Sequence, residues 1–251
     1  MRHFNGVIVV FERQMVRYWR HKLRWLVALV TPLFFLLFLS VGLKHIQLPG
    51  IEENYLVFSA PGIILMTVLF HSMFTGVELI FERQFGFLKE TLIAPIPRWE
   101  AILGKVLGGA VIGLIQGILM TFVAILAGMP IISFLGVIKA FFFLFLTGMA
   151  STAIGVAFAV KIHDTQGFVL IVNLVLFPLF FLSGALFPFT TAPWWLKFLV
   201  QLNPITYGVE GTRAALTGIQ QIGFVNCALV LFFFTVVVVW FSAKMFETVE
   251  E

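Results

Sequence analysis

Side chains that could carry out chemistry are few in this sequence, and they lie far apart. Asp164 is the single aspartate, and of five scattered histidines His71 alone lies well inside an apolar segment. The patterns H-E-x-x-H and G-x-S-x-G, which build metalloprotease and serine hydrolase sites, do not occur. The single cysteine, Cys227, excludes an internal disulfide and a cysteine-based metal site, which leaves it a packing role. We therefore expect no catalytic residues and no metal site. For His71 we favour a helix contact over a proton relay, because it has no carboxylate nearby in the sequence.

An internal energy source is also missing. Gly104 and Lys105 are followed by Val106, and no glycine lies five positions before Gly104, so the phosphate-binding pattern G-x-x-x-x-G-K-[ST] is not formed. Transporters driven by ion gradients usually place ionisable residues at mid-membrane depth, and the apolar segments here are almost free of charge. If this chain moves a solute uphill, the energy must come from another protein.

Residues 82–98 form a run of dense mixed charge between two long apolar segments. A helix from Phe81 would carry a narrow apolar stripe of Phe81, Phe85, Leu88 and Leu92. Its other side would carry Glu82, Arg83, Lys89 and Glu90. Pro95 and Pro97 would then end the helix, because neither can donate a backbone hydrogen bond. Such a helix either floats on the membrane surface or serves as a handle for a partner.

Two apolar residues on the polar side of this helix favour the handle. Phe87 and Ile93 lie among the charges, where a floating helix should be wholly polar, and an apolar residue ringed by polar ones is typical of a protein-binding surface. The alternative is that Phe87 packs against neighbouring membrane spans.

The composition indicates an integral membrane protein. Of 251 residues 61% are hydrophobic and 11% charged, and the mean hydropathy is +1.06. Soluble domains carry about 25% charged residues, so a soluble fold is excluded. The net charge of +4 indicates basic cytoplasmic loops rather than a nucleic-acid partner.

The N-terminal residues 4–24 predict a basic amphipathic helix. One face carries Phe11, Met15, Tyr18 and Trp19. The opposite face carries Arg13, Arg17 and Arg20. We expect this helix to lie on the inner leaflet, with membrane lipid as its partner and with its tyrosine and tryptophan at headgroup depth.

Six apolar segments follow, each close to the roughly 20 residues that a bilayer requires. They cover residues 25–43, 56–77, 101–127, 136–160, 168–187 and 224–243. Twelve of the sixteen Lys and Arg fall on the side of the N-terminus and of the 82–98 stretch. The positive-inside rule therefore predicts that both termini are cytoplasmic.

The last outer connection, residues 188–223, is too apolar for a loop in water and too rich in Pro and Gly to span. Pro193 and Pro204 each predict the start of a short helix. We expect two half-depth re-entrant helices packed on protein, over residues 188–218. Glu210 and Arg213 are three apart and could pair, either as an outer gate latch or as a local structural pair.

Two stretches resemble the ABC type-2 exporter permeases, especially drug-resistance-type members. The first is E-R-Q-F-G-F-L-K-E-T-L-I-A-P-I-P-R-W-E-A-I-L-G-K-V-L-G-G. The second comprises S-G-A-L-F-P, P-W-W-L and L-N-P-I-T-Y-G-V-E-G-T-R. With six spans and the basic N-terminal helix, the likeness covers nearly the whole chain. The sequence departs from the family in carrying Gly208, Glu210 and Gly211 where members often have Ala, Asp and Ala.

The resemblance implies an all-α, type V (subfamily G-like) fold, with residues 1–251 as one permease domain, residues 1–24 as a connecting helix and residues 82–97 as the coupling helix. It implies contact with the ATPase through Glu82, Arg83, Gly86, Phe87, Leu88, Lys89 and Glu90. It implies an outer gate made of Asn203, Pro204, Tyr207, Glu210 and Arg213. Two permease subunits, as a homodimer, would pair with two ATPase subunits that bind ATP and magnesium, so this chain itself would hold no cofactor.

The leading hypothesis is thus the non-catalytic membrane subunit of an exporter in a prokaryotic inner membrane. Spans rich in Phe, Leu and Val suit an amphipathic or hydrophobic cargo, such as a drug, a lipid or a lipid-linked glycan. The alternatives are a membrane enzyme, a secondary transporter, or a scaffold without an ATPase partner. The first two would require a charged or metal-binding cluster within the spans, which the sequence lacks.

Overall fold

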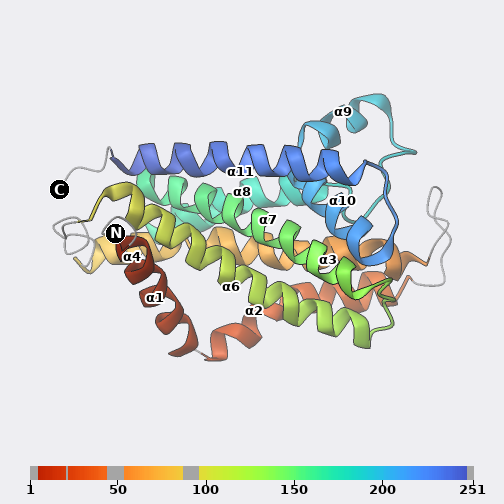
Figure 1. Ribbon diagram of the computed structural model, residues 1–251, viewed down its shortest axis with the longest axis horizontal. Helices are drawn as coiled ribbons and strands as arrows, with labels where there is room; N and C mark the ends of the chain where they lie inside the picture. The colour runs from red at the N-terminus through yellow and green to blue at the C-terminus, as the bar shows by residue number, and fades with distance from the viewer. Residues whose placement is uncertain (1–4, 21, 44–53, 87–95, 248–251) are drawn as a thin grey trace.

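The computed structural model describes residues 5–20, 22–43, 54–86 and 96–247, and all regular structure in these ranges is helical (Figure 1). In chain order the helices are α1 (Asn5–Arg20), α2 (Lys22–Phe35), the π-helix η1 (Leu36–Val41), α3 (Tyr55–Phe74), α4 (Val77–Gln84), α6 (Arg98–Leu126), α7 (Phe134–Lys161), α8 (Thr165–Phe181), α9 (Trp194–Leu202), α10 (Pro204–Thr217) and α11 (Phe224–Glu247). The prediction of an all-α membrane protein is confirmed.

Four helical segments are long and apolar enough to cross a bilayer: Tyr55–Gln84, which joins α3 and α4, and the helices α6, α7 and α11. Val27–Leu39 and Thr165–Phe181 are shorter apolar helices. These six segments follow the order of the six predicted spans, and crossing by the two shorter ones stays a prediction. The fifth predicted span, 168–187, is too long, because α8 ends at Phe181 and the chain turns at Gly184, whose φ is +69°.

Short polar side chains fix where several helices begin. Asn54 accepts a hydrogen bond from the backbone nitrogen of Leu56 (3.0 Å) at the start of α3. Ser133 and Asp164 do the same for α7 and α8, and Asn203 does so for α10, where Pro204 is the first helical residue. Each cap satisfies a backbone donor that the first helical turn leaves unpaired. The helix starts predicted at Pro193 and Pro204 are confirmed, whereas the membrane depth of α9 and α10 stays a prediction.

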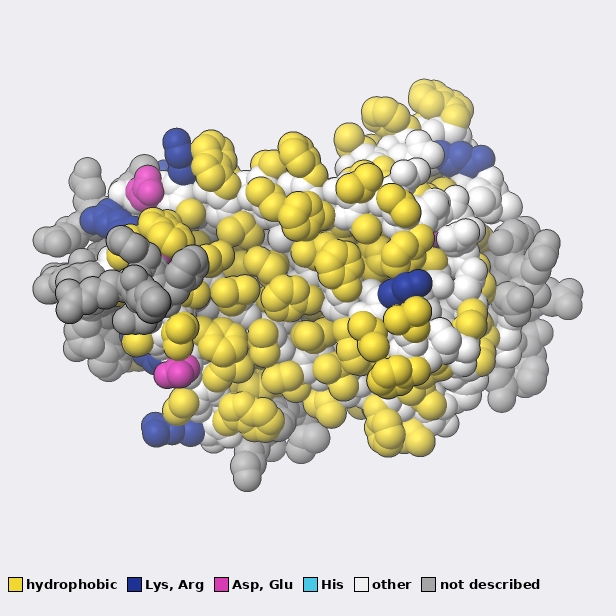
Figure 2. Space-filling model, viewed as in Figure 1, with side chains coloured by type: hydrophobic (Ala, Val, Ile, Leu, Met, Phe, Trp, Pro, Cys, Tyr) yellow, Lys and Arg dark blue, Asp and Glu magenta, His cyan; other side chains and the backbone are white. Residues whose placement is uncertain are grey.

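Helix α3 forms the centre of the bundle. Sixteen of its twenty residues are buried, and α6 and α7 pack along its length. Helix α11 is the opposite case, because its outward face exposes large apolar side chains such as Phe233, Trp240 and Phe241. Figure 2 shows apolar side chains covering the middle of the molecule, with most charged groups near one end. Such a belt is what a bilayer core requires.

The start of α1 and the end of α11 lie at the same end of the bundle, together with α4 and the start of α6 (Figure 1). Helices α9 and α10 lie at the opposite end. This arrangement agrees with an even number of crossings and separates the predicted ATPase contact from the predicted outer gate.

Glycine lets α3 and α7 approach each other closely. A Cβ atom built on Gly155 of α7 would lie 2.1 Å from the carbonyl oxygen of Met73, and one on Gly76 would lie 2.4 Å from the carbonyl oxygen of Gly155. Both clashes are with backbone, which cannot move aside as a side chain can. Small residues at such crossings allow van der Waals contact, which drives helix association inside lipid.

We predict that Gly155→Ala lowers the apparent Tm of the purified protein by roughly 3–10 °C, because the added methyl group must push the two helices apart. Gly223→Ala is the matched control, since its nearest neighbour would lie 3.7 Å away, at ordinary contact distance. Equal melting temperatures for both variants would contradict the close contact between α3 and α7.

Candidate functional site

Three arrangements of side chains stand out, and the first lies at the end of the bundle that holds the start of α1 and the end of α11. We call it the α4 ion cluster: Arg13, Arg17, Glu78, Glu82 and Lys105. Glu82 accepts from Lys105 Nζ through Oε2 (2.5 Å) and from Arg13 Nη2 through Oε1 (2.5 Å). Arg17 lies 3.4 Å from Glu82 Oε1 and 3.8 Å from Glu78 Oε2. The cluster ties α1, α4 and α6 together.

The buried pair dominates this cluster. The side chains of Glu82 and Lys105 are 3% and 6% exposed, whereas those of Arg13 and Arg17 are 38% and 36% exposed. Because solvent screens the two arginines, the ion pair of each contributes about 0–1 kcal/mol to stability. Loss of either Glu82 or Lys105, by contrast, would leave a buried charge without a counter-charge.

The structure corrects the predicted helix from Phe81 over residues 81–86. The helix does not run outward from Phe81; α4 ends at Gln84, and Gly86 turns the chain with a φ of +81°. The Glu82 side chain is buried by its partners Lys105 and Arg13, so it faces the protein interior rather than a polar outer surface. Arg83 donates to the carbonyl oxygens of Val160 (3.2 Å) and Ile162 at the end of α7. Phe87, Leu88, Lys89, Glu90 and Ile93 lie outside the described residues.

Helix α1 is amphipathic as predicted, but its buried face differs from the prediction. Val7, Val10, Gln14 and Tyr18 are buried. Tyr18 is buried between α1 and α6, where its hydroxyl oxygen accepts from Gln116 Nε2 (2.6 Å), and its depth in the membrane stays a prediction. Trp19 is exposed, as an interfacial residue should be. The Tyr18 ring also meets the edge of His71 at a centroid distance of 6.0 Å, which confirms His71 as a helix contact.

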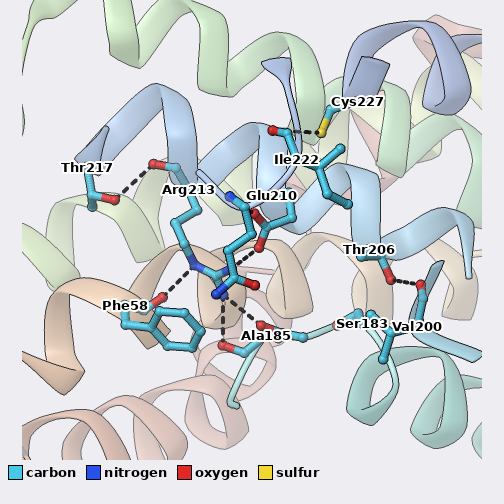
Figure 3. Close-up of polar contacts among 12 residues, drawn as sticks. Phe58, Ser183, Ala185, Val200, Thr206, Glu210, Arg213, Thr217, Ile222 and Cys227 are labelled. Carbon is cyan, nitrogen blue, oxygen red and sulfur yellow. Dashed lines mark hydrogen bonds and ion pairs between the residues drawn. The ribbon is translucent and has the colours of Figure 1, made fainter. Parts of the chain in front are cut away.

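The second arrangement, the Arg213 cluster, lies at the opposite end, between the start of α3 and the second half of α10 (Figure 3). Arg213 is completely buried, and its guanidinium stacks on the Phe58 ring at 3.9 Å. It donates to the carbonyl oxygens of Phe58 (2.9 Å), Gly184 (2.8 Å) and Ala185 (3.3 Å), and to Glu210. Glu210 Oε2 accepts from the backbone nitrogen of Gln221 (2.9 Å).

The Arg213 cluster is thus more than the local pair that the three-residue spacing indicated. It joins α10 to α3 and to residues 183–186, the non-helical chain after α8. Two other members of the predicted gate make their contacts elsewhere. Asn203 Nδ2 donates to the carbonyl oxygen of Leu179 (2.6 Å), while Tyr207 donates to that of Gln201 (2.8 Å) and is not part of the cluster.

Sequence reasoning missed several partners of these clusters. Phe58, Gly184 and Ala185 contribute mainly backbone carbonyls, which leave no signal in side-chain identity. Lys105 could have been found, because it lies one helical turn into a span, at a depth where a lysine needs a partner.

The third arrangement is a cavity of about 410 Å³ between α2, α3 and α8. Its apolar lining includes Phe70, Phe74 and Phe177, and its polar lining consists of Thr31, Thr67, His71 and Asn173. Phe70 and Phe177 meet edge to face at 5.6 Å. This size and lining suit an apolar or amphipathic small molecule.

We predict that Glu82→Gln lowers the free energy of unfolding by about 3–5 kcal/mol, because Lys105 would remain charged and buried without a counter-charge. The check is denaturant unfolding in detergent, with exposed Glu12→Gln in α1 as control. The added substitution Lys105→Met should restore part of the loss. Equal stability of Glu82→Gln and Glu12→Gln would contradict the dominance of the buried pair.

Comparison with known proteins agrees with the resemblance described above. Residues 5–217 match the family described as ABC-2 type transporter. The inner membrane transport permease YadH of Escherichia coli (strain K12) is 30% identical over 220 residues, which cover 84% of each chain. The protein named "Probable doxorubicin resistance ABC transporter permease protein DrrC" of Mycobacterium tuberculosis is 24% identical, over 82% of this chain and 75% of its own. This chain therefore belongs to the ABC-2 type transporter family, as a non-catalytic, multi-pass membrane permease subunit.

Proposed function

We propose that this permease exports an amphipathic or hydrophobic substrate from the cytoplasm by alternating access, driven by separate ATPase subunits. The observation that carries the proposal is the apolar cavity between α2, α3 and α8, which lies farther along α3 than the Arg213 cluster. The cavity is lined by the second half of α3, from Met66 to Phe74, while Arg213 contacts the same helix at Phe58. Twelve residues of helix separate Phe58 from Phe70, about 18 Å.

The predicted orientation of the two bundle ends assigns the cavity and the Arg213 cluster to opposite sides of the membrane. With both termini in the cytoplasm, as loop charge favours, the cavity lies in the cytoplasmic half and the Arg213 cluster closes the outer half. Substrate could then enter from the cytoplasm or the inner leaflet. We propose that this is the inward-facing state, and that a homodimer of the permease pairs with two ATPase copies in a prokaryotic inner membrane.

The contacts of α4 support a path by which movement of the ATPase reaches the cavity. We infer that the ATPase engages the chain from Gly86 to Pro97, while Glu82 and Arg83 pass its movement on to neighbouring helices. Movement there reaches α7 through Arg83 and reaches α1 through Glu82. The neighbouring α1 residue Tyr18 touches His71, which lines the cavity. A displaced α4 therefore has a physical connection to the cavity wall.

Replacing Phe87 or Glu90 by Ala is predicted to weaken ATPase binding about ten-fold and to lower coupled transport, while membrane insertion stays intact. The measurement is co-purification of both subunits from membranes, followed by transport in proteoliposomes. Phe232→Ala is the matched control, because Phe232 lies exposed on the lipid-facing side of α11. Unchanged subunit stoichiometry and unchanged transport would count against this docking segment.

Arg213→Lys tests the outer gate formed by Asn203, Pro204, Tyr207, Glu210 and Arg213. Lysine keeps the charge but lacks the planar fork that reaches several carbonyls at once. We predict about ten-fold lower ATP-driven export with ATP hydrolysis largely retained. Tyr55→Phe, which removes only the hydrogen bond to the carbonyl oxygen of Leu186 (2.9 Å), should act in the same direction but more weakly. Normal export by both variants would rule out the gate.

A further inference from the structure

The polar groups of the cavity between α2, α3 and α8 are uncharged amides and hydroxyls in an apolar wall. Asn173 faces it from α8 and Thr31 from α2. Within the described residues, neither the side-chain carboxamide of Asn173 nor the side-chain hydroxyl of Thr31 makes a hydrogen bond. The cavity's other threonine, Thr67, is buried and donates to the carbonyl oxygen of Ile63 (3.0 Å), so its donor is already used.

An unpaired amide in the middle of an apolar helix is unfavourable unless something polar reaches it. Asn173 lies half-buried, one turn before the exposed Phe177, on a helix whose other neighbours are apolar. Its carboxamide offers both donors and an acceptor, and the Thr31 hydroxyl also offers both. Together they can pair with hydroxyl or amide groups, which also carry donors and acceptors on adjacent atoms.

Charge is what this cavity does not supply. Its described lining contains no Asp, Glu, Lys or Arg. The nearest carboxylates along α3 and α4, Glu78 and Glu82, belong to the α4 ion cluster and are engaged by Arg17, Arg13 and Lys105. A charged head placed here would lose its hydration without gaining a counter-charge. His71 is the titratable side chain of the lining, and its ring is held against Tyr18.

We propose that the cavity selects amphipaths with an uncharged, hydrogen-bonding head, such as a sugar or an amide, and that Asn173 and Thr31 are its specificity-determining residues. The head binds Asn173 and Thr31, and the apolar tail lies against Phe70, Phe74 and Phe177. This inference rests on the proposed export function and narrows its substrate class to uncharged heads.

The test uses the permease with its ATPase partner in lipid nanodiscs. The probes are one diazirine-bearing alkyl chain with three different heads: a glucoside, a carboxylate and a quaternary ammonium. Photo-crosslinking followed by peptide mapping reports occupancy of α3 and α8, and titration gives relative affinities. The glucoside should label α3 and α8 saturably, about ten-fold more tightly than either charged probe.

Asn173→Leu should weaken the glucoside about ten-fold and leave the charged probes unchanged. Thr31→Val, at an exposed position that tolerates change, should weaken it less. Asn226→Leu is the matched control, because Asn226 is exposed near the start of α11, outside the cavity. Equal binding of all three heads, no labelling of α3 and α8, or a carboxylate preference that disappears in His71→Gln would overturn the inference.

ATP-driven export of the same probes separates this inference from the proposed function. Export of any of the three probes supports ATP-driven transport. The relative export rates of the three head groups then decide whether the cavity prefers uncharged heads. Export of the quaternary ammonium probe alone would therefore overturn the inference while leaving the exporter assignment in place.

Discussion

Non-helical backbone can lie within a membrane protein only if protein groups satisfy its hydrogen bonds, and much of this structure follows from that constraint. After α8 the chain leaves the helix and turns at Gly184. The carbonyl oxygens of Gly184, Ala185 and Leu186 then find their donors in Arg213 and Tyr55. One buried guanidinium thereby fixes the irregular segment, the start of α3 and helix α10 in a single arrangement. The charge of Arg213 is matched by Glu210, which in turn holds the backbone of Gln221.

The same principle operates at the other end with a different chemistry. There Glu82 is the buried anion, and cations from α1 and α6 surround it. At each end, a buried charge with several partners therefore holds separate parts of the chain together. Such clusters can exist in two discrete arrangements rather than deform gradually, which suits a transporter that alternates between states. The cavity between α2, α3 and α8 has hydrogen-bonding groups in its wall but no buried ion pair.

The helices could be predicted from the sequence because they depend on local patterns: apolar length for the spans, and Pro193 and Pro204 for the starts of the short outer helices. The partners of buried charges could not, because they depend on tertiary contact. Glu82 looked like part of an outer polar face, since helical periodicity continues past Gln84 and ignores the turn that Gly86 makes. Arg213 looked like half of a local pair, since backbone carbonyls do not appear in a sequence pattern. Tyr18 looked interfacial, although Gln116 draws it inward.

In the proposed transport cycle, the Arg213 cluster closes the outer end of the bundle in one state and releases it in the other. The most direct measurement is the electron spin distance between labels on Phe187, beyond the segment that Arg213 holds, and Gln220, beyond α10. It would be made in the complete transporter, with unlabelled permease in excess so that pairs within one chain dominate. The account predicts one short, narrow distance distribution without nucleotide and a second, longer one when ATP is trapped in the ATPase. A single distribution unchanged by trapped ATP, in a complex that still transports, would contradict it.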